Sequence, residues 1–248
     1  MRLLVVNPNT TVSMTATIAA AARAAAGPAT VIEPVTSAMG PTSIEGYYDE
    51  ALAVPGLLAA IRDGERSGAQ AAVIACFDDT GLDAARSMAA IPVLGICEAA
   101  LSLAACIARR FSVVTMSTVS CEPVTELVHR YGMGRRARVR AAGIPVLALD
   151  DPQSGALLRL RAEIAAALEE DAAEAIVLGC AGMADLAARL RAEFAVPVID
   201  GVGAAVKQAE ALVALGLATG KRGAYAAPHP KAYHGILEPF APEPIAVL

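Results

Sequence analysis

The sequence predicts an α/β fold of two pseudo-symmetric lobes, each a mainly parallel sheet flanked by helices, with the functional site in the cleft between them. Short apolar runs alternate with Ala- and Leu-rich segments of helix length along the 248 residues, which is typical of parallel strands joined by right-handed crossovers. The apolar runs are continuous, as in strands that are buried on both faces. The segment 71–93 also resembles the segment 174–198, which indicates an internal repeat.

The elements follow in order from these patterns. A strand at 2–6 ends at Asn7-Pro8-Asn9, and a helix at 11–26 ends at Gly27-Pro28. The later apolar runs predict strands at 30–34, 72–75, 92–95, 111–115, 137–141 or 144–148, 175–179 and 196–199. The Ala- and Leu-rich segments predict helices at 47–68, 80–89, 97–109, 120–131, 153–170, 184–193 and 202–218.

The repeat also predicts the limits of the lobes. One lobe is expected to contain 1–97 together with about 202–248, and the other lobe 98–201. The helix at 202–218 follows the last strand of the second lobe, so we expect it to return to the first. No flexible or low-complexity linker separates the halves, which predicts a tight cleft.

Each copy of the repeat carries a cysteine where a strand ends, Cys76 in the first and Cys180 in the second. Open α/β sheets bind ligands beyond the carboxyl ends of their strands, so both thiols are expected at the cleft. Backbone N–H groups and a helix N-terminus there would lower the pKa of each thiol. Cys97, Cys106 and Cys121 are interpreted as structural, because free cysteine behaves as a small hydrophobic residue.

Composition narrows the possible functions. The net charge is −5, aromatic residues make up 4% and Trp is absent, so we expect no nucleic-acid partner. The N-terminus lacks the apolar region of a signal peptide, and no apolar stretch predicts a membrane partner. The five cysteines are interpreted as reduced thiols of a cytoplasmic protein. No Cys-x-x-Cys motif or His-rich cluster predicts a metal site.

Six segments of the chain resemble the hydantoin/allantoin racemase branch of the aspartate/glutamate racemase superfamily. They span nearly the whole chain in order, at 7–10, 40–50, 75–81, 92–99, 179–183 and 197–202. The block Gly-Pro-x-Ser-Ile-Glu-Gly together with Gly-Cys-Ala-Gly-Met is the most specific part of the resemblance. The resemblance implies racemisation of a small molecule without a cofactor, with one cysteine serving each face of the substrate.

The chemistry of a hydantoin suits a pair of thiols. The hydrogen at C5 lies next to a ring carbonyl, so its removal gives an enolate-like anion. A thiolate on one side removes this proton, and a thiol on the other side returns one. The two groups must therefore start in opposite protonation states. Backbone N–H groups after each cysteine, such as those of Ala181 and Gly182, are expected to stabilise the developing oxyanion.

Further side chains are candidates for binding the substrate. Asn9 and the hydroxyl pair Ser117 and Thr118 follow strands, although simple helix capping is the alternative for these three. Tyr47 and its neighbour Tyr48 are expected to shape the pocket for the 5-substituent, with an exposed helix start as the alternative. The remaining candidates are Ser43, Phe77, Asp79 and Thr80.

Other functions stay open at this point. One is another activity of the superfamily, such as amino-acid racemisation or decarboxylation of a malonate; a decarboxylase needs only one thiol. A second is a non-catalytic two-lobed protein that binds a small molecule. A third is a redox protein in which Cys76 and Cys180 form a disulfide. A homo-oligomer is expected, but the sequence defines neither the number of subunits nor the preferred 5-substituent.

Overall fold

The computed structural model describes residues 1–146, 148 and 153–242. In these ranges the chain forms two four-stranded sheets, in which every pair of neighbouring strands is parallel. The first sheet has the order β2-β1-β3-β4, and the second has the corresponding order β6-β5-β7-β8. The strands are β1 (Arg2–Asn7), β2 (Val31–Thr36), β3 (Ala71–Ile74), β4 (Val93–Gly95), β5 (Phe111–Thr115), β6 (Ala137–Ala141), β7 (Ala175–Leu178) and β8 (Val198–Asp200).

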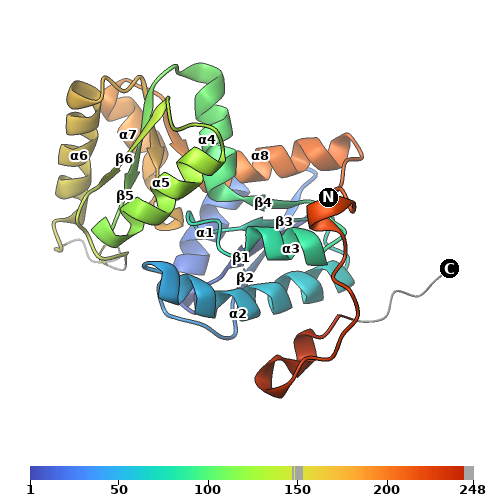
Figure 1. Cartoon of the computed structure of the whole chain (residues 1–248). Helices are drawn as coiled ribbons and strands as arrows, with labels where there is room; N and C mark the ends of the chain where they lie inside the picture. The colour runs from blue at the N-terminus through green and yellow to red at the C-terminus, as the bar shows by residue number, and fades with distance from the viewer. Residues whose placement is uncertain (147, 149–152, 243–248) are drawn as a thin grey trace.

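Helices connect the strands and cover both sheets, so that two lobes lie beside each other (Figure 1). The α-helices are α1 (Val12–Ala25), α2 (Tyr47–Arg66), α3 (Leu82–Met88), α4 (Ile96–Ile107), α5 (Cys121–Arg130), α6 (Ala156–Glu170), α7 (Ala187–Phe194) and α8 (Gly201–Ala214). Short 3-10 helices are η1 (Thr118–Ser120), η3 (Ala181–Leu186), η4 (Gly223–Tyr225) and η5 (Gly235–Phe240). The arrangement confirms the predicted two-lobed α/β fold.

Helices α4 and α8 join the lobes. They pack against each other, and α4 also contacts β7 and β8 of the second sheet while α8 contacts β3 and β4 of the first. One cluster of buried apolar side chains therefore runs through both lobes and includes Val5 of β1, Leu101 of α4, Val113 of β5 and Val206 of α8. A shared core of this kind holds the two sheets in a fixed relation.

The outer face of each sheet is covered by one long helix. Leu57 and Ile61 of α2 pack on β1 and β3 in the first lobe. Leu160 and Ile164 of α6 pack on the second sheet in the corresponding way. The inner strands β1, β3, β5 and β7 are thus buried on both faces, which is why their sequences are largely apolar, whereas the edge strands β2 and β6 are partly exposed and carry charged residues.

Most expected elements are present, with small shifts at their ends. Of the two alternatives at 137–141 and 144–148, the first forms the strand β6. Residue 147 of the second alternative lies outside the described residues. The expected helix at 153–170 begins at Ala156. The helix expected at 184–193 is preceded by η3. The helix expected at 202–218 ends at Ala214, because Gly216 adopts a positive φ of 66° and closes it.

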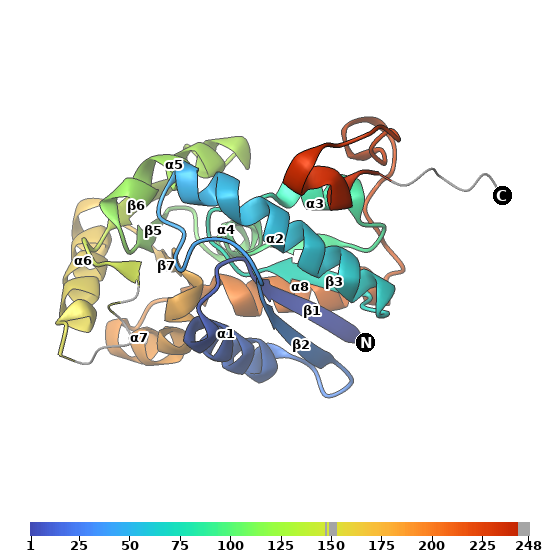
Figure 2. The same cartoon turned by 90° about the horizontal axis from the view of Figure 1, so that it is seen from below.

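The chain beyond α8 lies against α2 and α3 (Figure 2). Lys221 Nζ donates to the carbonyl oxygens of Arg86 and Ser87 at 2.5 and 3.0 Å, which closes the end of α3. Arg62 Nη1 of α2 donates to the carbonyl oxygen of Pro239 at 2.9 Å. Among the described residues, no helix is long and apolar enough to cross a membrane.

Candidate active site

Corresponding strands position the two cysteines. The backbone ladder of each sheet extends one residue past β3 and β7, because Ala75 N donates to Val6 O at 2.8 Å and Gly179 N donates to Val114 O at 2.9 Å. Cys76 and Cys180 come next, and a turn follows each of them. The N–H of Asp79 donates to Cys76 O and that of Met183 donates to Cys180 O, both at 3.1 Å. The internal repeat thus gives the two thiols equivalent backbone settings.

Both thiols line one small cavity between the lobes, with a volume of about 40 Å³. Loops after β1, β3, β5 and β7 contribute to it, so each lobe supplies part of the wall. The lining residues are Asn9, Met14, Ile44, Ala75, Cys76, Phe77, Asp78, Thr115, Met116, Ser120, Val146, Gly179, Cys180 and Ala181. The two cysteines thus share a cavity between the lobes, which is the position where the sequence predicts the functional site.

Loss of hydration dominates the electrostatics of both thiols. Cys76 and Cys180 are partly exposed to the cavity, but protein atoms surround them closely. Burial, aided by the charge of Asp78, raises the pKa of the Cys76 thiol well above its ordinary value. Burial likewise raises the pKa of the Cys180 thiol to about 11, although the Gly182 N–H donates to it. The expectation of a lowered thiol pKa is therefore wrong, since desolvation outweighs the loop donors.

Thr80 lies beside Cys76. Its side chain is fully buried, and its Oγ1 has no hydrogen-bond partner among the described residues. The hydroxyl is nevertheless near enough to Cys76 to lower the pKa of the thiol, against the larger effect of burial. A buried hydroxyl without a partner is costly. It gains a strong acceptor when the neighbouring sulfur becomes a thiolate.

Asn9 also faces the cavity, held by its own loop. Its Oδ1 accepts from Asn7 Nδ2 at 2.8 Å and from Thr11 N at 2.9 Å, which orients the amide. Among the described residues, its Nδ2 donates to the sulfur of Met14 alone, at 3.1 Å, and a thioether is a weak acceptor. The amide nitrogen of Asn9 can therefore donate to a carbonyl of a bound molecule.

Asp79, expected in the site, instead caps a helix. Its carboxylate accepts from the N–H groups of Cys97 and Glu98 at 2.9 and 3.0 Å, at the start of α4, and from Tyr131 OH at 2.7 Å. Burial raises its pKa to about 7 even though these donors lower it. A Cβ on Gly95 would lie 2.2 Å from Asp79 Oδ1, so this close approach requires glycine. Asp79 therefore ties the turn that follows Cys76 to the start of α4.

Besides Asp79 and Thr80, five other candidates do not line the cavity. Ser43 donates to Glu45 Oε1 at 3.0 Å, and Tyr47 is 53% exposed at the start of α2, where it interacts with Glu126 of α5. Ser117 precedes η1 and Thr118 is exposed in its first turn. Gly182 is beyond the wall but donates its N–H to Cys180.

The structure adds residues that the sequence interpretation did not select. Asp78 lines the cavity, whereas its neighbour Asp79 does not. Ser120 lines the cavity, whereas Ser117 and Thr118 do not. From the segment 40–50, Ile44 is the residue that lines it. The spacing of one 3-10 turn after β5 could have suggested Ser120. No pattern in the sequence distinguishes Asp78 from Asp79.

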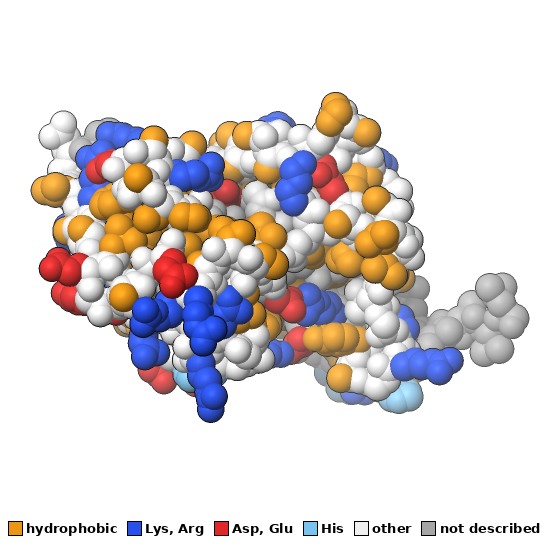
Figure 3. Space-filling view, turned by 90° about the horizontal axis from the view of Figure 1, so that it is seen from above, with side chains coloured by type: hydrophobic (Ala, Val, Ile, Leu, Met, Phe, Trp, Pro, Cys, Tyr) orange, Lys and Arg blue, Asp and Glu red, His pale blue; other side chains and the backbone are white. Residues whose placement is uncertain are grey.

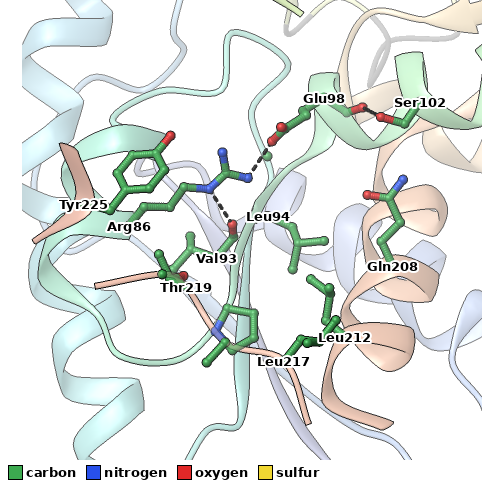
Figure 4. A pocket seen from close by; sticks show the side chains of 14 residues that line it. Arg86, Val93, Leu94, Glu98, Ser102, Gln208, Leu212, Leu217, Thr219 and Tyr225 are labelled. Atoms are coloured by element: carbon green, nitrogen blue, oxygen red, sulfur yellow. Dashed lines mark hydrogen bonds and ion pairs between the residues drawn. The ribbon is translucent and has the colours of Figure 1, made fainter. Parts of the chain in front are cut away.

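A larger cavity, of about 320 Å³, lies elsewhere, between β4, α4, α8 and the segment 217–225 (Figure 4). Arg86 crosses its wall, where Nε donates to Val93 O at 3.0 Å and Nη2 pairs with Glu98 at 2.5 Å. Neither Cys76 nor Cys180 lines it.

Within the described ranges, no three His, Cys, Asp or Glu side chains form a group that could hold a metal ion.

The chain is similar to known proteins over nearly its whole length. The profile of the family described as Asp/Glu/Hydantoin racemase matches residues 3–209. The chain is 52% identical to a hydantoin racemase of Rhizobium meliloti, covering 95% of this chain and 98% of the relative. It is 48% identical to a hydantoin racemase of Pseudomonas sp. strain NS671, covering 97% of each. The solved allantoin racemase of Klebsiella pneumoniae is 49% identical, covers 98% of this chain and 100% of its own, and superposes with a TM-score of 0.95.

Proposed function

Because this chain belongs to the Asp/Glu/Hydantoin racemase family and is a racemase, we propose that it racemises 5-substituted hydantoins or allantoin by cofactor-independent proton transfer at C5. Relatives named for hydantoin and for allantoin match it almost end to end. The cavity that both thiols share supports this substrate class and this mechanism.

The observation that carries the proposal is that Cys76 and Cys180 line the same cavity from equivalent strand ends of two lobes. A substrate between them meets one sulfur on each side. One sulfur, as thiolate, takes the C5 proton, and the electron pair of the C–H bond moves toward the ring carbonyl. The other sulfur, as thiol, gives its proton to the opposite face of C5. The enantiomer results, with the ionised and neutral thiols exchanged.

Neighbouring groups support the charge that moves through the site. The Thr80 hydroxyl donates to Cys76 when it is a thiolate, and the Gly182 N–H does so for Cys180. Asn9 Nδ2 donates to a substrate carbonyl, where negative charge develops in the transition state. Since the opposing thiol is neutral at the start, the raised pKa of each thiol keeps one proton available at neutral pH.

The charge of the wall favours a neutral ring over the substrates of related activities. The described residues that line the cavity include no Lys, Arg or His, and they include Asp78. An α-amino acid or a malonate would bring carboxylates to a site without a cation, which is costly in a buried place. A hydantoin or allantoin is uncharged. The second cysteine also argues against a decarboxylase, which needs one thiol.

The test is circular dichroism of purified enantiomers of allantoin, benzylhydantoin and isopropylhydantoin with the protein and no added cofactor. We expect the signal to decay to zero faster than in a protein-free control, and chelator treatment to leave the rate unchanged. Decay of aspartate or glutamate signals, with hydantoins unaffected, would contradict the proposal. Loss of thiol titre without substrate conversion would favour the redox alternative.

We also propose that the protein acts in the cytoplasm as a homo-oligomer, with lobes divided as 1–97 plus about 202–248 and 98–201. All five cysteines are free, which suits a reducing compartment.

An exposed apolar surface supports the proposal of a homo-oligomer. Hydrophobic side chains gather on the face seen from above (Figure 3), and Leu103 and Ile107, one turn apart on α4, are 37% and 59% exposed. Light scattering of the parent and of a Leu103→Lys variant tests this surface.

A further inference from the structure

Asp78 is the acidic residue of the cavity wall, and the proton transfer described above does not use it. It lies two residues after Cys76 and lines the same cavity as both thiols. It is 8% exposed, and it influences both sulfurs, because its charge raises the pKa of Cys76 and of Cys180. The position therefore looks onto the space between the two reacting groups.

The carboxylate of Asp78 has no hydrogen-bond or ion-pair partner among the residues that the structure describes. None of the described residues donates a hydrogen bond to it or forms an ion pair with it, whereas Asp79 next to it has three donors. Its charged neighbours, Glu50 and Asp79, are both acidic, and burial together with these charges raises its pKa to about 7. A buried carboxylate without a protein donor is unfavourable, and because Asp78 lines the cavity, a bound molecule that brings a donor would relieve this cost.

A hydantoin ring brings the donors that this carboxylate lacks. The ring has two N–H groups and no negative charge, while its carbonyl oxygens suit the amide of Asn9, which lines the same cavity. We propose that Asp78 is a substrate-binding residue that accepts a ring N–H of the hydantoin and thereby fixes C5 between the two thiols. This inference rests on the proposed function, and it defines the substrates as rings that carry a free N–H.

The hydrogen bond forms in the ground state and persists in the transition state. Its loss should therefore raise KM more than it lowers kcat. A hydrogen bond to a charged group is strong, so replacement by Ala should raise KM about 10- to 100-fold. Loss of the negative charge also lowers the pKa of both thiols, so kcat should not fall in parallel.

The experiment combines protein variants with methylated substrates. Racemisation of 5-benzylhydantoin and of its 1-methyl and 3-methyl derivatives is followed by circular dichroism with the parent, Asp78→Ala and Asp78→Asn. We expect the parent to discriminate strongly against one methylated ring, and both variants to lose most of that discrimination. Asn is a matched control for size, because it keeps a neutral acceptor that binds an N–H more weakly than a carboxylate.

A second control removes a negative charge outside the wall. Glu50→Gln changes the charge near Asp78 without changing a lining residue, and it should keep the parental preference between the free and methylated rings. Equal discrimination by the parent and Asp78→Asn would show a steric effect and overturn the inference, as would an unchanged KM in Asp78→Ala. If the parent protein racemises no hydantoin, the proposed function itself is overturned. If the parent is active but its discrimination against methylated rings does not depend on Asp78, only the role of Asp78 is overturned.

Discussion

Replacement of Thr80 by Val should change stability and activity in opposite directions. The Thr80 side chain is fully buried and its hydroxyl has no hydrogen-bond partner among the described residues. A buried hydroxyl without a partner costs about 1–3 kcal/mol, and Val has nearly the same shape without the hydroxyl. We therefore expect Thr80→Val to stabilise the fold by about 1 kcal/mol, which raises Tm by about 2–4 °C in a chain of this size.

The same change should slow racemisation. The hydroxyl is the side-chain donor that lowers the pKa of Cys76, and a hydrogen bond to a charged group contributes about 1.5–3 kcal/mol. Its loss should reduce kcat/KM roughly 10- to 100-fold. Because the two enantiomers have equal free energy in solution, kcat/KM must fall by the same factor in both directions.

The assay pairs thermal unfolding with circular dichroism of each pure enantiomer. Thr80→Ser keeps the hydroxyl and serves as the control, and it should retain most of the activity while losing stability through the missing methyl group. A Val variant that racemises at the parental rate, or that melts at a lower temperature than the parent, would refute the role assigned to the hydroxyl.

Three further predictions follow from the cavity. Cys76→Ser and Cys180→Ser should each nearly abolish racemisation while exchanging deuterium from heavy water into C5 of only one enantiomer, a different one for each variant; mass spectrometry of both enantiomers checks this. Phe77→Ala should change the activity ratio of benzylhydantoin to allantoin by at most about 1–3 kcal/mol, whereas Tyr47→Ala and Tyr48→Ala, at residues 53% and 78% exposed, should leave that ratio unchanged. Burial raises the pKa of both thiols, and one thiol must ionise for the reaction to start. We therefore expect kcat/KM, determined from initial rates, to rise from pH 7 into the alkaline range. A maximum of kcat/KM at acidic pH would contradict this.

The sequence predicted the fold because its signals are local. Strands buried on both faces are continuously apolar, so Leu3–Val6 and Ala71–Ile74 stand out without knowledge of their neighbours. The internal repeat then placed Cys76 and Cys180 at matching strand ends. Parallel strands bring such ends to one edge of a sheet, and this geometric rule was enough to predict a shared cleft.

The walls of the cavity depend on backbone angles that the sequence does not display. Asp79 adopts a positive φ of 47°, which is uncommon outside glycine, and its carboxylate lies against α4. Asp78 is left facing the thiols. In the same way, the 3-10 turn η1 places Ser120 in the wall and leaves Thr118 exposed. The choice between adjacent polar residues is thus made by a turn of the main chain.

The thiol pKa was mispredicted for a different reason. A helix N-terminus and loop N–H groups are visible in the sequence, but the degree of burial is not. At Cys180 the Gly182 N–H lowers the pKa, yet burial raises it to about 11. The two effects have opposite signs, so only the closed packing of both lobes decides which one is larger.

The contact between Asp79 and Tyr131 limits how the two lobes can be exchanged with those of a relative. Asp79 comes three residues after Cys76, while Tyr131 is the C-terminal cap of α5 in the other lobe. Their 2.7 Å hydrogen bond joins the cap of α4 to the end of α5. A chimera that inherits only one of the pair would leave either a tyrosine hydroxyl or a carboxylate without its partner beside Cys76. Apolar contacts between lobes tolerate replacement by side chains of similar volume. Functional recombinants should therefore be those in which both residues come from one parent.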